Sequence, residues 1–148
     1  MKSDFQLLDY AVLNFGYNNK NPNEDSSKFD FQLKNHIHIQ DDERKGTIVT
    51  RITAKSSTDS VDDQVGISML FAAIFHAGKN SDKDAFQKML QLNGMATIIP
   101  IIRSIIATAS TTLGFGGKVI LPNIDITKLD WDNEEETTAS DVPPMSEN

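Results

Sequence analysis

The clearest strand pattern lies at residues 29–40 (FDFQLKNHIHIQ), where apolar side chains take the odd positions and polar ones the even positions. Asn35 interrupts the apolar row. This period of two predicts a β-strand with one covered face and one wet face. The charged residues 41–46 predict a hairpin turn. Residues 47–55 (TIVTRITAK), rich in β-branched side chains, predict the second strand of the hairpin.

Two further stretches predict strands with weaker patterns. Residues 5–17 (FQLLDYAVLNFGY) carry an apolar row at odd positions that Asp9 breaks. Residues 64–77 (QVGISMLFAAIFHA) are apolar in both rows, so this strand is either covered on both sides or presents an apolar patch to a partner. One of its rows is a candidate core row and also a candidate groove for extended segments of other chains; it contains Ile67, Met69, Phe71 and Phe75.

Helical spacing begins at residues 81–92 (SDKDAFQKMLQL), where Ser81 and Asp84 resemble a capping box. The Asn93-Gly94 pair predicts the end of this first helix. A second helix is predicted over Met95 to Leu113 (MATIIPIIRSIIATASTTL), the most apolar segment of the chain. With Thr97 as N-cap, Pro100 would fall in the first turn, where a missing N–H does no harm.

The apolar arc of the long helix is too wide for one sheet to cover, which predicts a second contact surface provided by another subunit. Its length also invites a membrane-span interpretation. Arg103 lies in its middle, however, and a central arginine costs about 3 kcal/mol on insertion. We therefore expect a helix that is not embedded in a membrane. The candidate subunit interface follows the helical spacing Ile98, Ile102, Ile105 and Ile106.

Strands grouped before helices predict an α+β domain, a four-stranded antiparallel sheet followed by a long packed helix. The length of 148 residues fits one domain, which we place at residues 1–129. Residues 130–148 are expected to form an acidic, disordered tail. Seven of the 21 acidic residues lie in 129–148, so the remaining 14 acids balance the 14 bases of the body. A neutral body without a basic stripe argues against nucleic-acid binding.

Nothing in the chain supports covalent chemistry, and we predict neither catalytic residues nor a cofactor. There is no cysteine, which suits a reducing compartment, and residues 1–6 contain no apolar leader that would suggest secretion. Residues 114–118 (GFGGK) close a helix, whereas a phosphate loop opens one. His36 and His38 share a strand face but lack spaced partners, so we expect no metal site.

Two segments of the C-terminal half resemble the SecB family of export chaperones. Residues 98–103 (IIPIIR) look like the family's hydrophobic-Phe-Pro-x-x-Arg entry into its long helix, with Ile99 in place of Phe. Residues 121–129 (LPNIDITKL) are similar to the family's Pro-hydrophobic-Asn-Phe-Asp-x-Leu segment. The preceding strands agree in number, order and spacing, and an acidic tail is family-like. The helical insert at 81–92 and the apolar fourth strand depart from the family.

The resemblance implies a cytoplasmic, ATP-independent holdase, active in protein export, that binds unfolded polypeptides in apolar grooves. It also implies a homotetramer, a dimer of dimers with the long helices sandwiched between sheets. Transfer of clients to the translocation motor SecA would use an acidic sheet surface, for which Asp30 lies on a suitable face. The candidate client-binding residues are Ile67, Met69, Phe71, Phe75 and Phe115.

Two alternatives remain open at this point. A dedicated chaperone for one partner, such as a labile antitoxin, would use the same fold. A small-ligand or metal-binding module would instead use His36 and His38.

Overall fold

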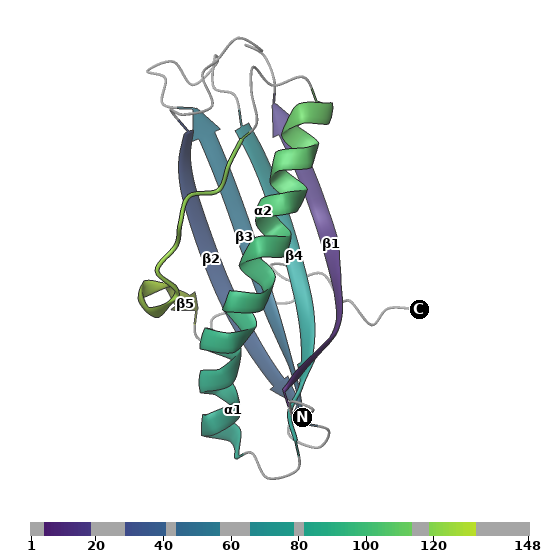
Figure 1. Cartoon of the computed structure of the whole chain (residues 1–148), viewed down its shortest axis with the longest axis vertical. Helices are drawn as coiled ribbons and strands as arrows, with labels where there is room; N and C mark the ends of the chain where they lie inside the picture. Colours follow the sequence, from purple (N-terminus) through teal and green to yellow (C-terminus); the bar gives the residue numbers. More distant parts are fainter. Residues whose placement is uncertain are drawn as a thin grey trace.

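The computed structural model describes residues 5–18, 29–40, 44–56, 66–78, 82–113 and 119–132. They form one twisted sheet with a long helix laid obliquely across one face (Figure 1). The strand order is β1-β4-β3-β2-β5, and the four long strands pair antiparallel. The predicted α+β class is confirmed, and a short fifth strand is added. The strands are β1 (Gln6–Asn18), β2 (Phe29–Gln40), β3 (Lys45–Ser56), β4 (Gly66–His76) and β5 (Trp131–Asp132).

β2 and β3 form the predicted hairpin, in the predicted orientation. Leu33 lies opposite Ile52, and Ile37 lies opposite Ile48, so the apolar rows of both strands face the helix. Asn35 sits within this apolar row and is fully buried, as is its cross-strand neighbour Thr50. The Thr50 hydroxyl donates to Asn35 Oδ1 at 2.9 Å, which satisfies both groups inside the core.

β1 does not follow the predicted row of odd-numbered residues. Its pairing with β4 is irregular between Leu7 and Asp9 and again between Val12 and Asn14. Each such bulge adds one residue to β1, so the residues beyond it change faces. Tyr10 and Val12 consequently pair with Ala73 and Phe71 on the helix side of the sheet. A period-two pattern cannot reveal a bulge, because the bulge breaks the period itself.

The two predicted helices are one continuous helical run from Lys83 to Thr112. It comprises α1 (Lys83–Met89), a π-helical turn (Leu90–Gly94) and α2 (Met95–Thr112). The predicted helix end at Asn93-Gly94 is therefore wrong. The N-cap is Asp82, whose carboxylate accepts from the Ala85 N–H at 2.7 Å, whereas Ser81 lies outside the described residues.

Gly94 serves close packing rather than helix termination. Its backbone is helical, with φ −62°, and a Cβ at this position would lie 2.7 Å from Ile48 Cδ1. The helix thus approaches β3 so closely that a side chain at this position would displace the end of Ile48. The other predicted cap was also wrong, since Thr97 lies inside the run and its hydroxyl donates to the Asn93 carbonyl at 2.8 Å. Pro100 accordingly lies inside α2, on its exposed side, rather than in a first turn.

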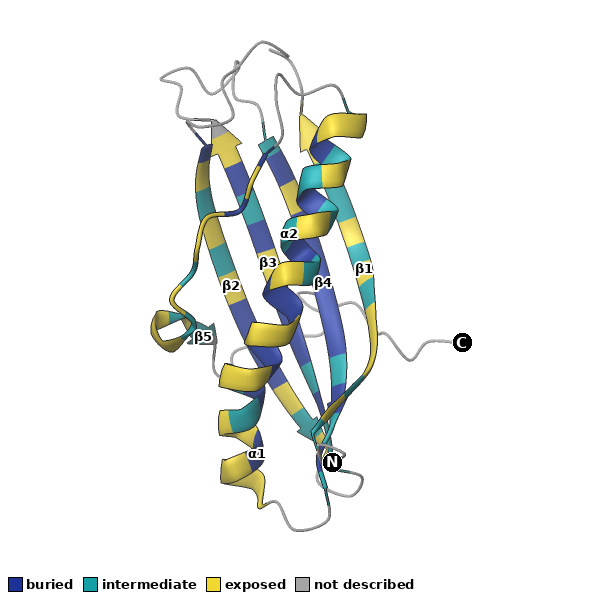
Figure 2. Ribbon diagram, viewed as in Figure 1, coloured by how far each residue is buried: buried dark blue, intermediate teal, exposed yellow. Residues whose placement is uncertain are grey.

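α2 turns its apolar stripe toward the sheet and a small, polar stripe outward (Figure 2). Ile98, Ile102 and Ile106 are fully buried in the core beneath it. Ser104 and Thr108 are exposed on the opposite side. By length and hydropathy alone the run from Lys83 to Thr112 qualifies as a membrane span, a test that the core helix of a folded domain also passes.

The C-terminal segment 119–132 runs back from the helix to the edge of the sheet (Figure 1). The Val119 N–H donates to Ser110 Oγ at 2.8 Å, and Arg103 Nε donates to the Leu121 carbonyl at 3.1 Å. Asn35 Nδ2 donates to the Asp130 carbonyl at 3.1 Å, next to the parallel pairing of β5 with β2. The described strand β5 therefore begins two residues after the predicted boundary at 129.

Candidate functional site

The predicted client-binding residues form the interior of this chain. Ile67, Met69, Phe71 and Phe75 are at most 2% exposed and lie under the helix. Phe115 lies outside the described residues. In this structure a bound polypeptide cannot touch the four β4 side chains unless the helix moves. Their role in client binding remains a prediction, and an open groove has to be sought elsewhere.

The predicted subunit-interface residues are divided between the core and the surface. Ile98, Ile102 and Ile106 have no exposed area left for a second subunit, because the sheet of the same chain covers them. Ile105 is only half-buried. A helix sandwiched between two sheets would therefore have to offer the stripe that contains Ser104 and Thr108 to the second sheet. The predicted interface itself remains untested.

Exposed apolar side chains gather on β1, in a set that we call the β1 strip: Leu8, Tyr10, Val12 and Tyr17, each at least 40% exposed. β1 is an edge strand, paired on one side only, by β4, within the described residues. The oblique path of α2 leaves much of β1 uncovered in Figure 2. An edge strand with free backbone groups and apolar side chains is a site where another extended chain can pair.

Tyr10 is the best-placed member of the β1 strip. Its ring stacks on that of buried Phe71, with centroids 5.7 Å apart and an interplanar angle of 27°. Val12 pairs with Phe71 across the strands. Contact with the core fixes Tyr10 while leaving nearly half of its surface open, which suits a preformed apolar contact. The sequence carries a signal for this site, since Leu8, Tyr10 and Val12 make even-numbered positions apolar too.

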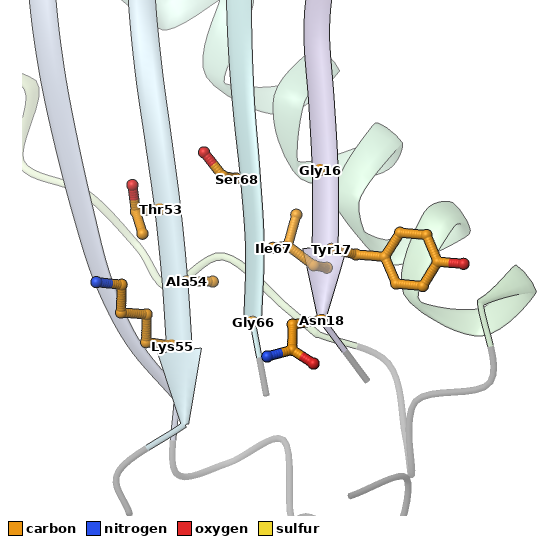
Figure 3. A pocket seen from close by; sticks show the side chains of 9 residues that line it. All are labelled: Gly16, Tyr17, Asn18, Thr53, Ala54, Lys55, Gly66, Ile67 and Ser68. Carbon is orange, nitrogen blue, oxygen red and sulfur yellow. The ribbon is translucent and has the colours of Figure 1, made fainter. Parts of the chain in front are cut away.

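A cavity of about 210 Å³ lies at one end of β1, β3 and β4 (Figure 3). Gly16 and Gly66 line it, and a Cβ on Gly16 would meet nothing within 4 Å. Thr53, Ser68 and Lys55 add polar side chains to it. Its small volume and mixed lining fit a few side-chain atoms of a ligand better than a whole small molecule.

The face of the sheet away from the helix, which we call the outer face, carries more bases than acids. Across β1 to β4 the register places Lys34, Lys45, Arg51 and Lys55 there and, of the acids, Asp9 and Asp30, while Asp132 of β5 pairs with His36 at its edge. The resemblance to SecB implies an acidic sheet surface for SecA. Asp30 is exposed as predicted, but the bases around it make this face positive.

His36 and His38 point to the outer face and lie two residues apart on β2. His36 is buried beside β5, where it pairs with Asp132, and His38 is exposed. Within the described ranges no three His, Cys, Asp or Glu side chains come together as a metal site would require. Among the described residues, the fold brings no third side chain of these types to the pair.

A short turn holds the C-terminal segment in place. Asp125 accepts from the Thr127 hydroxyl at 2.6 Å and from the Thr127 N–H at 3.0 Å. The hydrogen bond from the Thr127 hydroxyl, and to a smaller extent the one from the Thr127 N–H, lowers the pKa of the Asp125 carboxyl below its ordinary value of 3.8. Arg103 and Asn35 hold the two ends of the same segment, and neither role was foreseen from the sequence.

The fold is SecB-like. Over 82% of this chain and 91% of the other, it superimposes with a TM-score of 0.66 on a SecB-like chaperone of Mycobacterium tuberculosis, Rv1957. That protein was solved in complex with a peptide, termed ChAD, from the antitoxin HigA1. The two chains are 12% identical, so the likeness concerns the fold.

A protein of unknown function from Streptococcus agalactiae is a more distant likeness. It has a TM-score of 0.45 and 15% identity, over 83% of this chain and 100% of that one. No protein-family model matches the sequence, and no curated protein matches it.

Proposed function

We propose that this protein is an ATP-independent chaperone that holds unfolded polypeptides. The observation that carries the proposal is the β1 strip, four large exposed side chains on a strand whose outer edge pairs with none of the described strands. The SecB-like fold supports it, because a chaperone with that fold binds a peptide of another protein. The proposed role is binding without catalysis and needs no cofactor.

In this proposal the client adds to the sheet as an extended strand along β1. Backbone hydrogen bonds to the free edge are independent of client sequence, which suits a protein that accepts non-native chains. Tyr10 and Val12 then supply apolar contacts on the helix side of the sheet. The proposed client site thus lies next to Phe71, one of the residues predicted to bind clients, and the Tyr10 ring separates Phe71 from the client.

The test is suppression of aggregation by the purified full chain, without ATP. A chemically denatured client is diluted into buffer, and its light scattering is followed with and without the protein. We expect scattering to fall as the chain approaches stoichiometric amounts. Unchanged scattering at a several-fold excess would contradict the proposal.

A matched pair of variants locates the site. Tyr10→Ser with Val12→Ser removes two apolar groups of the β1 strip, and Leu92→Ser with Ile120→Ser removes two exposed apolar groups elsewhere. We expect only the first double variant to lose the suppression. Molar mass from light scattering is measured alongside. A mass that falls in step with the lost activity would assign the β1 strip to subunit contact instead.

A dedicated chaperone for one partner is the second candidate. The peptide in the Mycobacterium tuberculosis complex comes from an antitoxin, which favours a single-client role for this chain too. Affinity purification from the source cells, read by mass spectrometry, separates the two roles. One dominant co-purifying protein indicates a dedicated chaperone, and many indicate a general one.

The remaining parts of the proposal come from the resemblance. We propose a cytoplasmic homotetramer in which the outward stripe of α2, including Ser104 and Thr108, faces a second subunit. Small side chains there permit close approach of another element. Transfer of clients to SecA would need an acidic surface, whereas the described outer face bears more bases than acids. The proposal therefore rests on polypeptide holding rather than on export.

A further inference from the structure

The outer face of the sheet contains a small apolar cluster. Val49, Leu70 and Ala72 are at most 6% exposed, and Leu13 packs against them. Among the described elements, the helices pack on the opposite face of the sheet, and none lies over this cluster. Side chains on an open sheet face would be more exposed than this, so their burial calls for a covering segment beyond the described elements.

Positive charge adjoins this cluster. Lys34 lies directly opposite Arg51 on the outer face, and Arg51 lies opposite Leu70 of the cluster. Like charges facing each other across two strands are destabilising unless an anion lies between them. Both side chains are exposed, and Lys55 adds a third base on the same face. The covering segment should therefore be both acidic and apolar.

The chain's own C-terminal residues leave the described structure at the edge of this face. Asp132 pairs with His36, which lies opposite Val49, and Val49 lies opposite Ala72. Residues 133–148 thus begin next to the row of cross-strand partners that includes Val49 and Ala72 of the cluster. Sixteen residues reach about 50 Å when extended, while the strands lie only about 4.8 Å apart.

The composition of residues 133–148 matches what the face requires. They contain five acidic residues and no Lys or Arg. The acidic run 134–136 lies close to Asp132 and hence within reach of Lys34 and Arg51. The apolar run 142–145 (VPPM) lies far enough along the chain to cross to Leu70 and Leu13.

We propose that residues 133–148 dock on the outer face of their own sheet. In this arrangement the acidic run lies against Lys34 and Arg51, and the apolar run covers the Val49–Leu70–Ala72 cluster. The docked segment withholds a positive surface from acidic partners. The inference does not depend on the proposed chaperone activity, because it concerns the face opposite the helix.

The chain contains no cysteine, so a single introduced cysteine can carry a spin label. We would label Ser140→Cys with a nitroxide in methyl-labelled full-length protein. That sample is diluted into excess unlabelled, unmodified chain, so that only effects within one chain are seen. We expect the methyl signals of Val49 and Leu70 to broaden and those of Ile98 and Ile102, under the helix, to stay sharp.

A charge swap tests the electrostatic part. Arg51→Glu should lower the ratio of docked to undocked segment about fivefold, because it replaces attraction with repulsion at an exposed site. Lys88→Glu, on the exposed side of α1, is the matched control and should leave the broadening unchanged. Raising the salt concentration should weaken docking in the unmodified chain, since exposed charges are screened.

Three results would overturn the proposal. The first is the absence of broadening at Val49 and Leu70. The second is broadening of the helix-side methyls instead. The third is broadening that appears only when the spin label and the isotope label are on different chains, which would assign the segment to a second copy.

Discussion

β1 and β4 are neighbouring, paired strands that are both apolar in both rows, yet they differ in burial. β4 lies between two strands, with the helix over one of its rows and the outer-face cluster in the other. β1 lies at the edge, and four of its large side chains are at least 40% exposed. The comparison shows that an apolar pattern identifies the side chains that can be buried. The position of the strand in the sheet decides which of those side chains are buried.

The two bulges sharpen this difference. They place Tyr10 and Val12 on the helix side, where α2 does not cover them. The same bulges turn Leu13 to the outer-face cluster. β1 thus carries two bulges in its pairing with β4. Bulges in an edge strand change how readily that edge pairs with another chain.

The largest expected effect comes from charging the helix that covers β4. Ile102→Asp should lower the free energy of unfolding by about 4 kcal/mol or more, because it buries a charge without a partner. Ile105→Asp, at a half-buried position, should cost about 1 kcal/mol. Urea unfolding followed by circular dichroism measures both. Equal losses would mean that α2 does not face the sheet as described.

Truncation on the two strands themselves tests the comparison directly. Phe71→Ala on β4 removes a fully buried ring and should cost about 3–5 kcal/mol, from lost burial and the cavity left behind. Val12→Ala on β1 should cost less than about 1 kcal/mol. The same unfolding assay applies. A large loss at Val12 would show that β1 is covered in solution, for instance by a second subunit.

The other edge of the sheet provides a contrast with β1. β5 pairs with Asn35 and His36 in the middle of β2, and Asn35 connects Thr50 to the Asp130 carbonyl. Asn35→Ala should cost about 1–3 kcal/mol, because it leaves buried polar groups without partners. Hydrogen exchange of the Trp131 amide should also accelerate. Gln32→Ala, exposed on the same strand, serves as the control and should change stability by less than about 0.5 kcal/mol.

The smallest effect concerns the turn that brings the chain to β5. The folded-state pKa of Asp125 lies below the unfolded value of 3.8, so its stabilisation is fully present above pH 3.8. It is lost as the pH falls through the lowered pKa. Asp125→Asn should therefore be slightly less stable than the parent chain above pH 3.8, and the difference should vanish in stronger acid. Thermal unfolding at a series of pH values measures this.

A second variant checks that the effect comes from the turn. Thr127→Val removes the hydroxyl that donates to Asp125 and should reproduce part of the loss over the same pH range. A difference that persists unchanged in strong acid would contradict the assignment to the Asp125 carboxylate.

Much of the fold was predictable because local pattern and local pairing agree. The hairpin of β2 and β3 follows from alternation and a short charged turn, and the register confirms it. The core row of β4 was identified as a candidate core row, and the structure places it in the core. Its predicted part in client binding stays a prediction. The helix was placed correctly, but its internal caps were not. Gly94 has a local preference to end a helix that its packing against Ile48 overrides, and Thr97 lies inside the run instead of capping it.

The sequence shows that even-numbered positions of β1 are apolar, but it does not show on which face of the sheet they lie. Period-two analysis of β1 assigns Tyr10 and Val12 to the wrong row, since a bulge leaves no local signal. Asn35 appeared only as an interruption of an apolar row, and Arg103 as a central charge and as the arginine of the family-like helix entry. Their hydrogen bonds join residues up to 95 positions apart in the chain, and such contacts cannot be inferred from neighbours.

By itself the sequence determined which segments extend and which coil, because side-chain spacing must match a backbone period for a face to be buried. It also determined that the negative charge lies at the C-terminal end. Only the tertiary structure decided which apolar rows meet the helix, which strand remains at the edge and which face becomes positive. Those outcomes depend on strand order and register, which are properties of the whole sheet and of no single strand.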